Sequence, residues 1–350
     1  MLTTERATRG SKARGASGFV ATPVRFVATM TPPDLADRLF GPGFELLINA
    51  GATPLAAAPY ASFDAPDARD ALAQADVLIT GWGASPLTDS QLDAAPGLRY
   101  VLHAGGQAAG LLPVSARKRG IQVSNAGWLN AIPVAEFTYS MIVLANKQTF
   151  RSRRLYGERR DHIDREVEFP SAGNRDKVIG IVGASRIGRI VMERLGDLDV
   201  TVQLYDPFVT PAEVARLGAR LVSLDEVMAT SDVVTLHPPL NAATTGMITA
   251  RHLGLMRDGA TLINTSRGPV VDQDALIREL RRGRIEAILD VTDPDVLPPD
   301  SELHTLPNVF LTPHISGSMG TEIRRLGEHV ASELNRIVLG HALTFPETLR

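Results

Sequence analysis

Short apolar runs alternate with longer amphipathic stretches along the chain from about residue 20. The runs are rich in Val, Ile and Leu, and those of the first half are followed by Gly, Pro or another turn-forming residue. This alternation is typical of parallel sheets whose strands are joined by crossover helices. It predicts one series of strands at residues 24–29, 44–50, 76–81, 98–104 and 121–126, and a second at 177–183, 200–206, 232–237, 260–266, 285–291 and 308–314.

The stretches between these runs carry signals for helix ends. Ser223 is followed three residues later by Glu226, which matches a capping box, and Asp272 stands where an N-cap belongs. Apolar residues at positions 323, 326, 330, 334 and 337 predict a last helix from about residue 320 to 339, with Gly340 as its C-cap.

Three stretches depart from the alternation. Residues 132–146 are apolar on almost every side, which predicts a helix buried between layers or domains. Residues 147–177 mix basic and acidic side chains with little periodicity, which favours a solvated arm over a nucleic-acid patch. The basic, Ser-containing start weakly resembles a transit peptide, but residues 1–19 are better interpreted as a disordered tail.

Composition then excludes several classes of protein. The 350 residues suffice for about two domains, and 36 Lys and Arg against 39 Asp and Glu give no field that attracts nucleic acid or an anionic membrane. The absence of Cys excludes disulfide scaffolds, thiolate metal sites and cysteine nucleophiles. No apolar run reaches the length of a membrane helix, and no secretory signal is present. We expect a cytoplasmic protein without nucleic-acid, membrane or metal partners.

The sharpest local signal is VIGIVGASRIGRIVMERL, at residues 178–195. A predicted strand runs into Gly183, and Gly188 opens a helix whose first amides can hold a pyrophosphate. Asp206 ends the next strand, where a carboxylate accepts hydrogen bonds from an adenosine ribose and repels a 2′-phosphate. The context favours dinucleotide binding over a structural turn, and NAD over NADP. Ser185 replaces the usual middle Gly, and its side chain would loosen binding or reshape the loop.

Ionisable residues follow three strands of the second series. They are Arg267 in NTSRGPVVD, an acidic cluster in LDVTDPD, and His314 in LTPHISGS. A guanidinium fits a substrate carboxylate, an imidazole transfers one proton near neutral pH, and a carboxylate beside the imidazole orients it. Beside a nicotinamide, this set would reduce a 2-keto acid to a 2-hydroxy acid.

In these motifs the chain resembles the D-isomer-specific 2-hydroxyacid dehydrogenase family over roughly residues 20–345. The resemblance implies catalytic Arg267 and His314, with the dyad acid at Asp295, and a substrate-carboxylate loop at Gly105, Gly106 and Gln107. His237 is interpreted as a further residue on the cofactor side. The full set of expected NAD contacts is Gly183, Ser185, Arg186, Ile187, Gly188, Asp206, His237, Thr265, Ser266, Arg267, Asp290, His314, Ser316 and Gly317.

The dyad position departs from the family, which usually has Glu followed by Pro where this chain has Asp295 and Val296. Asp is one methylene shorter, so either the backbone moves in or a water bridges to His314. Asp293 would point to the opposite side of an extended segment. A formate-dehydrogenase-like site, with Gln at the dyad position, fits poorly because an acid is retained. Trp82 and Trp128 would either line the substrate pocket or pack in the core.

The predicted fold class is α/β with two Rossmann-like domains. Residues 20–127 and 315–350 would form a flavodoxin-like substrate domain, and residues 128–314 an inserted, doubly wound NAD-binding domain. The predicted function is interconversion of a D-2-hydroxy acid and its 2-keto acid with NAD. Family resemblance implies a homodimer, for which the helix from Ile132 and the arm after it are candidate contacts. The alternative is a non-catalytic, NAD(H)-sensing protein like the corepressors of the same family.

Overall fold

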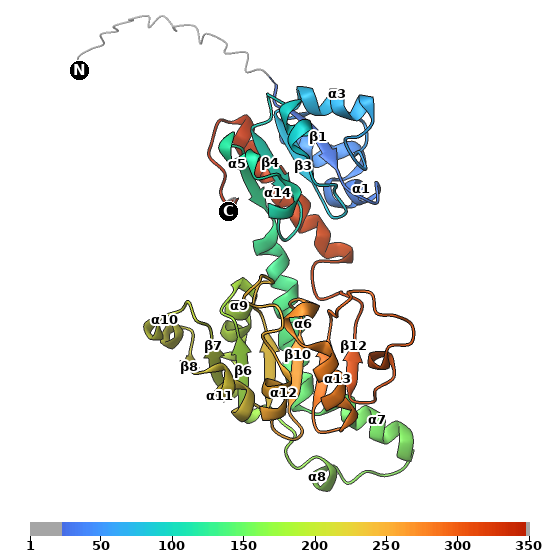
Figure 1. Ribbon diagram of the computed structural model, residues 1–350, viewed down its shortest axis with the longest axis vertical. Helices are drawn as coiled ribbons and strands as arrows, with labels where there is room; N and C mark the ends of the chain where they lie inside the picture. The colour runs from blue at the N-terminus through green and yellow to red at the C-terminus, as the bar shows by residue number, and fades with distance from the viewer. Residues whose placement is uncertain (1–22, 348–350) are drawn as a thin grey trace, which may run out of the picture.

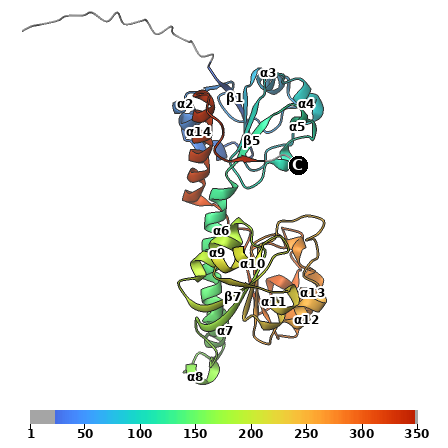
Figure 2. The same cartoon turned by 90° about the vertical axis from the view of Figure 1, so that its left-hand side faces the viewer.

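The computed structural model describes residues 23–347. It has two α/β lobes, and the first and last of the described residues lie in the same lobe, while the middle of the chain forms the other (Figures 1 and 2). Helix α6 (Gly127–Asn146) and the segment that leads into α14 (Ile323–Val338) connect the lobes. The predicted disordered tail, residues 1–19, lies outside the described residues.

The first lobe contains a six-stranded sheet in the order β13-β5-β4-β3-β1-β2, parallel except for the terminal strand β13. Ignoring β13, this is the flavodoxin-like order. Alternate residues of each strand face opposite cores: Phe26 and Ala28 of β1 pack with α1, α2 and α14, and Val27 packs with α3, α4 and α5. The strands are β1 (Arg25–Thr29), β2 (Thr53–Pro54), β3 (Val77–Thr80), β4 (Tyr100–His103), β5 (Gln122–Asn125) and β13 (Pro346–Glu347). The helices are α1 (Leu35–Phe40), α2 (Glu45–Asn49), α3 (Pro66–Gln74), α4 (Asp89–Asp93) and α5 (Ser115–Lys118).

The second lobe contains a seven-stranded sheet in the order β12-β11-β10-β9-β6-β7-β8, parallel throughout. Its order is that of a doubly wound dinucleotide-binding fold with one added strand. Helices α6 and α9 cover one face, and α11, α12 and α13 cover the other. The strands are β6 (Arg175–Val182), β7 (Asp199–Tyr205), β8 (Ala219–Leu221), β9 (Val233–Leu236), β10 (Thr261–Asn264), β11 (Glu286–Leu289) and β12 (Val309–Leu311). The helices are α9 (Arg186–Leu195), α10 (Pro211–Arg216), α11 (Leu224–Thr230), α12 (Ala250–Leu255) and α13 (Gln273–Arg281). The predicted fold class is confirmed.

One predicted strand is wrong. Within residues 44–50 the chain forms the helix α2 (Glu45–Asn49), and the strand that joins the sheet is β2, a few residues later. In this run Phe44 and Leu47 are buried while Ile48 is 46% exposed. That spacing of three residues is helical, and a short apolar run does not distinguish the two structures by itself.

Both N-caps that the sequence predicted are present. Asp272 caps α13 by accepting a hydrogen bond from Ala275 N at 2.9 Å, and Ser223 accepts one from Glu226 N at 3.2 Å. The Glu226 side chain does not return to Ser223 but pairs with Arg220 instead. The segment predicted as an irregular arm contains two helices, α7 (Thr149–Arg159) and α8 (Arg165–Glu168).

By length and composition, α6 could also cross a membrane, with a mean hydropathy of 1.3. Core helices of soluble proteins pass the same test. Here Ala135 and Ile142 pack in the core of the second lobe, and Thr138 contacts Thr265 of that lobe. The apolar character of α6 therefore serves, at least on this face, to bury it against the sheet.

Candidate active site

At the start of α6, Gly127 lies close to residues of both lobes, and its lack of a side chain leaves room for this approach. A Cβ on Gly127 would lie 2.4 Å from the carbonyl oxygen of Gly106 and 3.2 Å from Nη1 of Arg186. Gly106 belongs to the predicted substrate loop after β4, and Arg186 begins α9 in the predicted dinucleotide turn. The structure therefore places these two predicted sites against each other.

The dinucleotide turn needs its two glycines. Gly183 has φ +96°, and a Cβ there would lie 2.9 Å from Pro238 N, while a Cβ on Gly188 would lie 2.2 Å from Gly183 O. Ser185 takes the N-cap position of α9, and its Oγ accepts a hydrogen bond from Gly188 N at 3.4 Å. The first-turn amides, among them those of Arg186 and Ile187, have no partner within an α-helix, so they suit a phosphate.

Asp206 ties this turn to the end of β7. One carboxylate oxygen accepts a hydrogen bond from Ala184 N at 2.7 Å, and the other accepts one from Phe208 N at 2.8 Å. A carboxylate has about four acceptor positions, so hydroxyl groups of a ribose can share it. The residues at this turn fit an NAD molecule.

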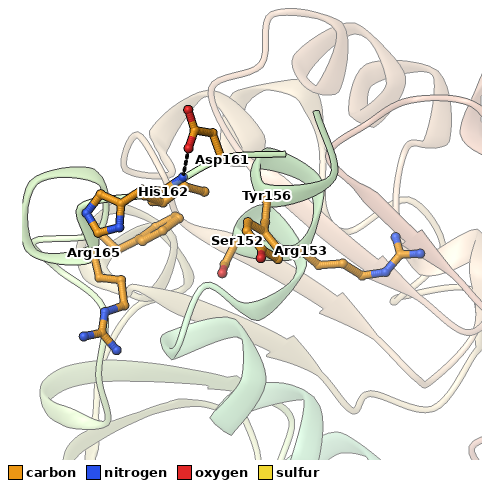
Figure 3. Close-up of a pocket in the computed structure, with 8 residues that line it drawn as sticks. Ser152, Arg153, Tyr156, Asp161, His162 and Arg165 are labelled. Carbon is orange, nitrogen blue, oxygen red and sulfur yellow. Dashed lines mark hydrogen bonds between the residues drawn. The ribbon is translucent and has the colours of Figure 1, made fainter. Parts of the chain in front are cut away.

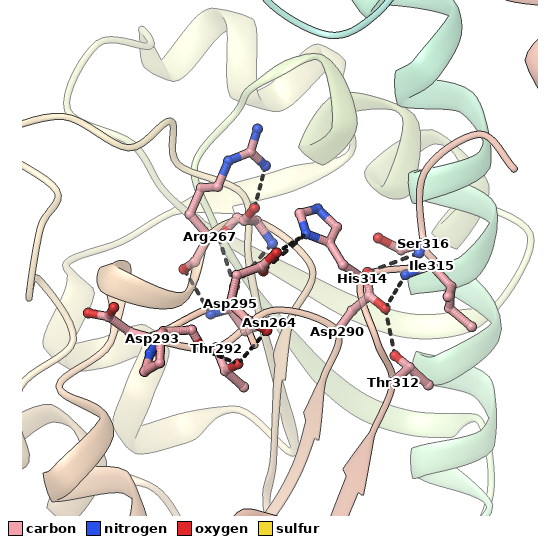
Figure 4. A network of polar contacts seen from close by, with 12 residues as sticks. Asn264, Arg267, Asp290, Thr292, Asp293, Asp295, Thr312, His314, Ile315 and Ser316 are labelled. Carbon is pink, nitrogen blue, oxygen red and sulfur yellow. Dashed lines mark hydrogen bonds and ion pairs between the residues drawn. The ribbon is translucent and has the colours of Figure 1, made fainter. Parts of the chain in front are cut away.

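The predicted dyad is in direct contact. Nδ1 of His314 lies 3.1 Å from each carboxylate oxygen of Asp295 (Figure 4). The shorter acid therefore reaches the imidazole directly, as expected if its backbone lies close to the ring. Because Nδ1 faces the carboxylate, Nε2 is left for a reacting group. Both side chains are about half exposed.

The loop that carries His314 is held by Asp290. This carboxylate is 1% exposed, and it accepts hydrogen bonds from Ile315 N at 2.8 Å, Ser316 N at 2.9 Å and Thr312 Oγ1 at 2.6 Å. The backbone N of His314 also donates to Asp290 O. Asp290 was expected to contact the cofactor, and its support of the loop that carries His314 was not predicted from the sequence.

Arg267 follows β10, beside the dyad (Figure 4). Asn264 shapes its loop, since the Asn264 amide donates to Arg267 O at 3.0 Å and accepts from Ser266 N at 3.0 Å and Ser266 Oγ at 2.8 Å. Asn264 was not predicted from the sequence. Asn is nevertheless common in turns of this kind, because its side chain bonds to the backbone two residues later. The guanidinium donates to Ser266 O.

Three of the other predicted cofactor residues have neighbours of their own. Thr265 bonds to Thr138 of α6 through their hydroxyl groups, at 2.9 Å. His237 is buried, with Nε2 at 3.1 Å from Thr235 Oγ1, and Nδ1 has no partner among the described residues. Gly317 faces Asn130, whose side-chain oxygen accepts from Ser318 N at 2.9 Å. Asn130 was not predicted from the sequence.

The predicted substrate loop rests on His103. A Cβ on Gly105 would lie 2.4 Å from Nε2 of His103, and Nδ1 of that ring lies 2.9 Å from Thr80 Oγ1. Gly106 is half-buried and Gln107 is exposed. His103 therefore supports the start of this loop from beneath, between Thr80 and Gly105.

Burial keeps two histidines uncharged, and this makes the fold acid-sensitive. Desolvation lowers the pKa of His103 to about 4 and that of His237 to about 3. Below pH 6.5 the unfolded chain binds protons that the folded chain does not, so the free energy of unfolding falls as the pH falls. We expect His103→Gln to reduce this slope by about 1.4 kcal/mol per pH unit between about pH 6.5 and 4 in urea titrations. Parallel curves for the variant and the wild type would contradict this.

Trp82 and Trp128 are 37% and 44% exposed, so neither packs in the core. A hollow between α7 and α8 is lined by Arg153 and Arg165, whose guanidinium groups point away from each other (Figure 3). They do not converge on one ligand. Within residues 23–347 there is no group of three or more acidic, His or Cys side chains that would hold a metal ion.

Known proteins that are similar to this chain indicate one family. Residues 139–316 match the model of the D-isomer specific 2-hydroxyacid dehydrogenase NAD-binding domain. A glyoxylate reductase of Korarchaeum cryptofilum is 32% identical over 251 residues, which are 71% of this chain and 76% of that protein. The chain belongs to the D-isomer-specific 2-hydroxyacid dehydrogenase family. The predicted family and its NAD-binding domain are confirmed.

Two further members of the family are also similar to this chain. A D-3-phosphoglycerate dehydrogenase of Mycobacterium leprae is 32% identical over 283 residues, 79% of this chain, but the chain spans only 52% of that relative. The crystal structure of D-lactate dehydrogenase from Aquifex aeolicus with NAD and lactic acid matches at a TM-score of 0.69 and 26% identity. That match covers 90% of this chain and 96% of the other.

Proposed function

We propose that this protein is an NAD-dependent dehydrogenase that interconverts a D-2-hydroxy acid and its 2-keto acid. The observation that carries the proposal is the contact of His314 with both carboxylate oxygens of Asp295, next to Arg267 at the carboxyl ends of the sheet. Relatives named glyoxylate reductase, phosphoglycerate dehydrogenase and D-lactate dehydrogenase support the reaction class.

Bound NAD would supply the hydride donor or acceptor that no side chain of the protein provides. Gly183 and Gly188 leave room for the pyrophosphate, and the start of α9 offers amides to it. Asp206 would accept hydrogen bonds from the ribose and disfavour a 2′-phosphate. The set therefore favours NAD over NADP.

The side chains of the dyad would move the proton. With Nδ1 donating to Asp295, His314 would give the proton on Nε2 to the carbonyl oxygen of a 2-keto acid during reduction. In the oxidation the neutral ring would accept it from the hydroxyl group. The nearby carboxylate favours the protonated imidazole and orients the ring, so it assists the reduction most.

Arg267 and the substrate loop would hold the substrate. A guanidinium binds a carboxylate through two parallel hydrogen bonds and polarises the adjacent carbonyl group. The backbone amides of Gly106 and Gln107 would bind the same carboxylate from the first lobe. We also propose that the protein is cytoplasmic and forms a homodimer through α6 and the arm of α7 and α8.

A panel of 2-keto acids tests the proposal. With NADH, the nicotinamide absorbance should fall on addition of glyoxylate, hydroxypyruvate or a longer 2-keto acid, and NADPH should be used less efficiently. A protein that binds NADH tightly but turns over none of these compounds would be an NAD(H)-sensing binding protein instead.

The dyad assignment makes a separate prediction. Asp295→Asn is expected to lower kcat for reduction by about 10²-fold, because the amide does not stabilise a charged imidazole. Asp295→Glu, which retains the charge, should keep kcat within about threefold of the wild type. A silent Asp295→Asn variant in steady-state assays would show that the dyad is wrongly assigned.

A further inference from the structure

The dyad acid lies on an exposed segment. The side chain of Asp295 is 60% exposed, and its only side-chain partner among the described residues is His314. Side chains with so few contacts usually sample several positions. The 3.1 Å contacts therefore depend on how the backbone on either side of Asp295 is held.

Two residues hold the backbone just before Asp295. Gly268 packs against Thr292 so closely that a Cβ on Gly268 would lie 1.9 Å from Thr292 O. The hydroxyl group of Thr292 donates to Pro294 O at 2.7 Å and to Asp295 O at 3.2 Å. This fixes the beginning of the segment and joins it to the loop after Arg267.

Gln273 fixes the next peptide groups. Its side-chain Nε2 donates to Asp293 O at 2.5 Å, and its Oε1 accepts a hydrogen bond from Asp293 N at 2.9 Å. One amide thus satisfies both backbone groups of a single residue, as a neighbouring strand would. Gln273 is the first residue of α13, a helix capped by Asp272 and anchored in the core by Leu276. This clamp, the pair of hydrogen bonds between the Gln273 side chain and the Asp293 backbone, therefore starts from a helix that is itself fixed in the core.

We propose that Gln273 is a positioning residue that keeps the short dyad acid within reach of His314. The inference rests on the proposed function. Gln273 bonds only to the backbone of Asp293 and donates nothing to the dyad itself. An Asp side chain has one methylene less than Glu, so it reaches the imidazole only if its backbone stays close. Without the clamp the segment moves outward, and the carboxylate no longer orients or stabilises the charged ring.

Charge around His314 stays the same in the variants that test this. Besides Asp295, the charged groups near the ring are Asp290 beneath its loop and Arg267 beside it, while Asp293 precedes the acid on the same segment. Gln273 is neutral, so Gln273→Ala removes the two hydrogen bonds without adding or removing a charge. A change in rate that Asp295→Glu rescues then reports the position of Asp295.

The test compares Gln273→Ala with the double variant Gln273→Ala/Asp295→Glu. In Gln273→Ala, kcat for reduction should fall between about tenfold and a hundredfold, with the NADH dissociation constant unchanged. The longer Glu should restore the reach, so the double variant should be several-fold faster than Gln273→Ala. Arg278→Ala, an exposed position on the same helix, is the matched control and should behave as the wild type.

A readout without turnover accompanies the kinetics. In the cofactor-free protein, the NMR signal of the His314 Nδ1 proton, which its hydrogen bond to Asp295 shifts downfield, should move upfield or disappear in Gln273→Ala, and Asp295→Glu should reverse the change. Equal signals and rates in Gln273→Ala and wild type would overturn the inference. So would a Gln273→Ala variant that slows without rescue by Asp295→Glu. If the wild type turns over no 2-keto acid, the proposed function fails, and the NMR comparison still decides the clamp.

Discussion

His314→Asn is expected to abolish measurable reduction of 2-keto acids while NADH still binds. A positioned general acid contributes about 10² to 10⁴ in rate, and Asn has no proton to transfer near neutral pH. His314 has φ +56°, a left-handed conformation that Asn tolerates better than Ala. The loop itself is held through backbone atoms of Ile315 and Ser316, which the substitution keeps. The effect should therefore be chemical rather than structural.

Two measurements check this result. Steady-state kinetics should give a kcat at least about 10³-fold below the wild type, and a fluorescence titration should give an NADH dissociation constant within about threefold. His314→Ala should lose turnover equally but melt at a lower temperature, because of its strained backbone. A His314→Asn variant within tenfold of the wild-type rate would remove His314 from the mechanism.

Replacing Arg267 should have the second largest effect. Arg267→Ala would remove the two charge-assisted hydrogen bonds proposed to hold the substrate carboxylate, each worth about 1.5–3 kcal/mol, so kcat/KM should fall by about 10² to 10⁴. Arg267→Lys keeps the charge but not the planar fork, so it should recover only part of the loss. The loop keeps its shape in both, because Asn264 bonds to the backbone of Arg267.

Chemical rescue by guanidinium distinguishes a loss of substrate binding in Arg267→Ala from a loss of folding. Added guanidinium ion should raise the activity of Arg267→Ala but not that of the wild type or of His314→Asn. The measurement is the initial rate against guanidinium concentration at constant ionic strength. An Arg267→Ala variant with unchanged KM and kcat would show that another group binds the carboxylate.

The sequence predicted most of the second lobe because its signals are local. The strand before Gly183, the helix after it and the N-cap at Asp272 each depend on residues a few positions apart. The wrong strand at residues 44–50 and the unpredicted β13 have another cause. A short apolar run fits a helix or a strand, and β13 pairs with a strand more than 200 residues earlier in the chain.

The sequence predicted the ionisable side chains of the site but not the residues that hold them in place. Arg267, Asp295 and His314 follow three strand ends, and parallel strands bring such ends to one edge. The direct contact of Asp295 with His314 was not predictable, because it depends on Gln273 and Gly268, which reach the acidic segment only in the folded chain. Asp290 was assigned to the cofactor for a similar reason, since its three partners come from the next loop.

The central claim is that this site transfers a hydride to C2 of a 2-keto acid. NADH deuterated at both C4 positions of the nicotinamide tests it directly, with mass spectrometry and chiral chromatography of the product. We expect a 2-hydroxy acid of D configuration that carries one deuterium at C2, and none with His314→Asn. Tight binding of NADH with no deuterated product from any 2-keto acid of the panel would contradict the account.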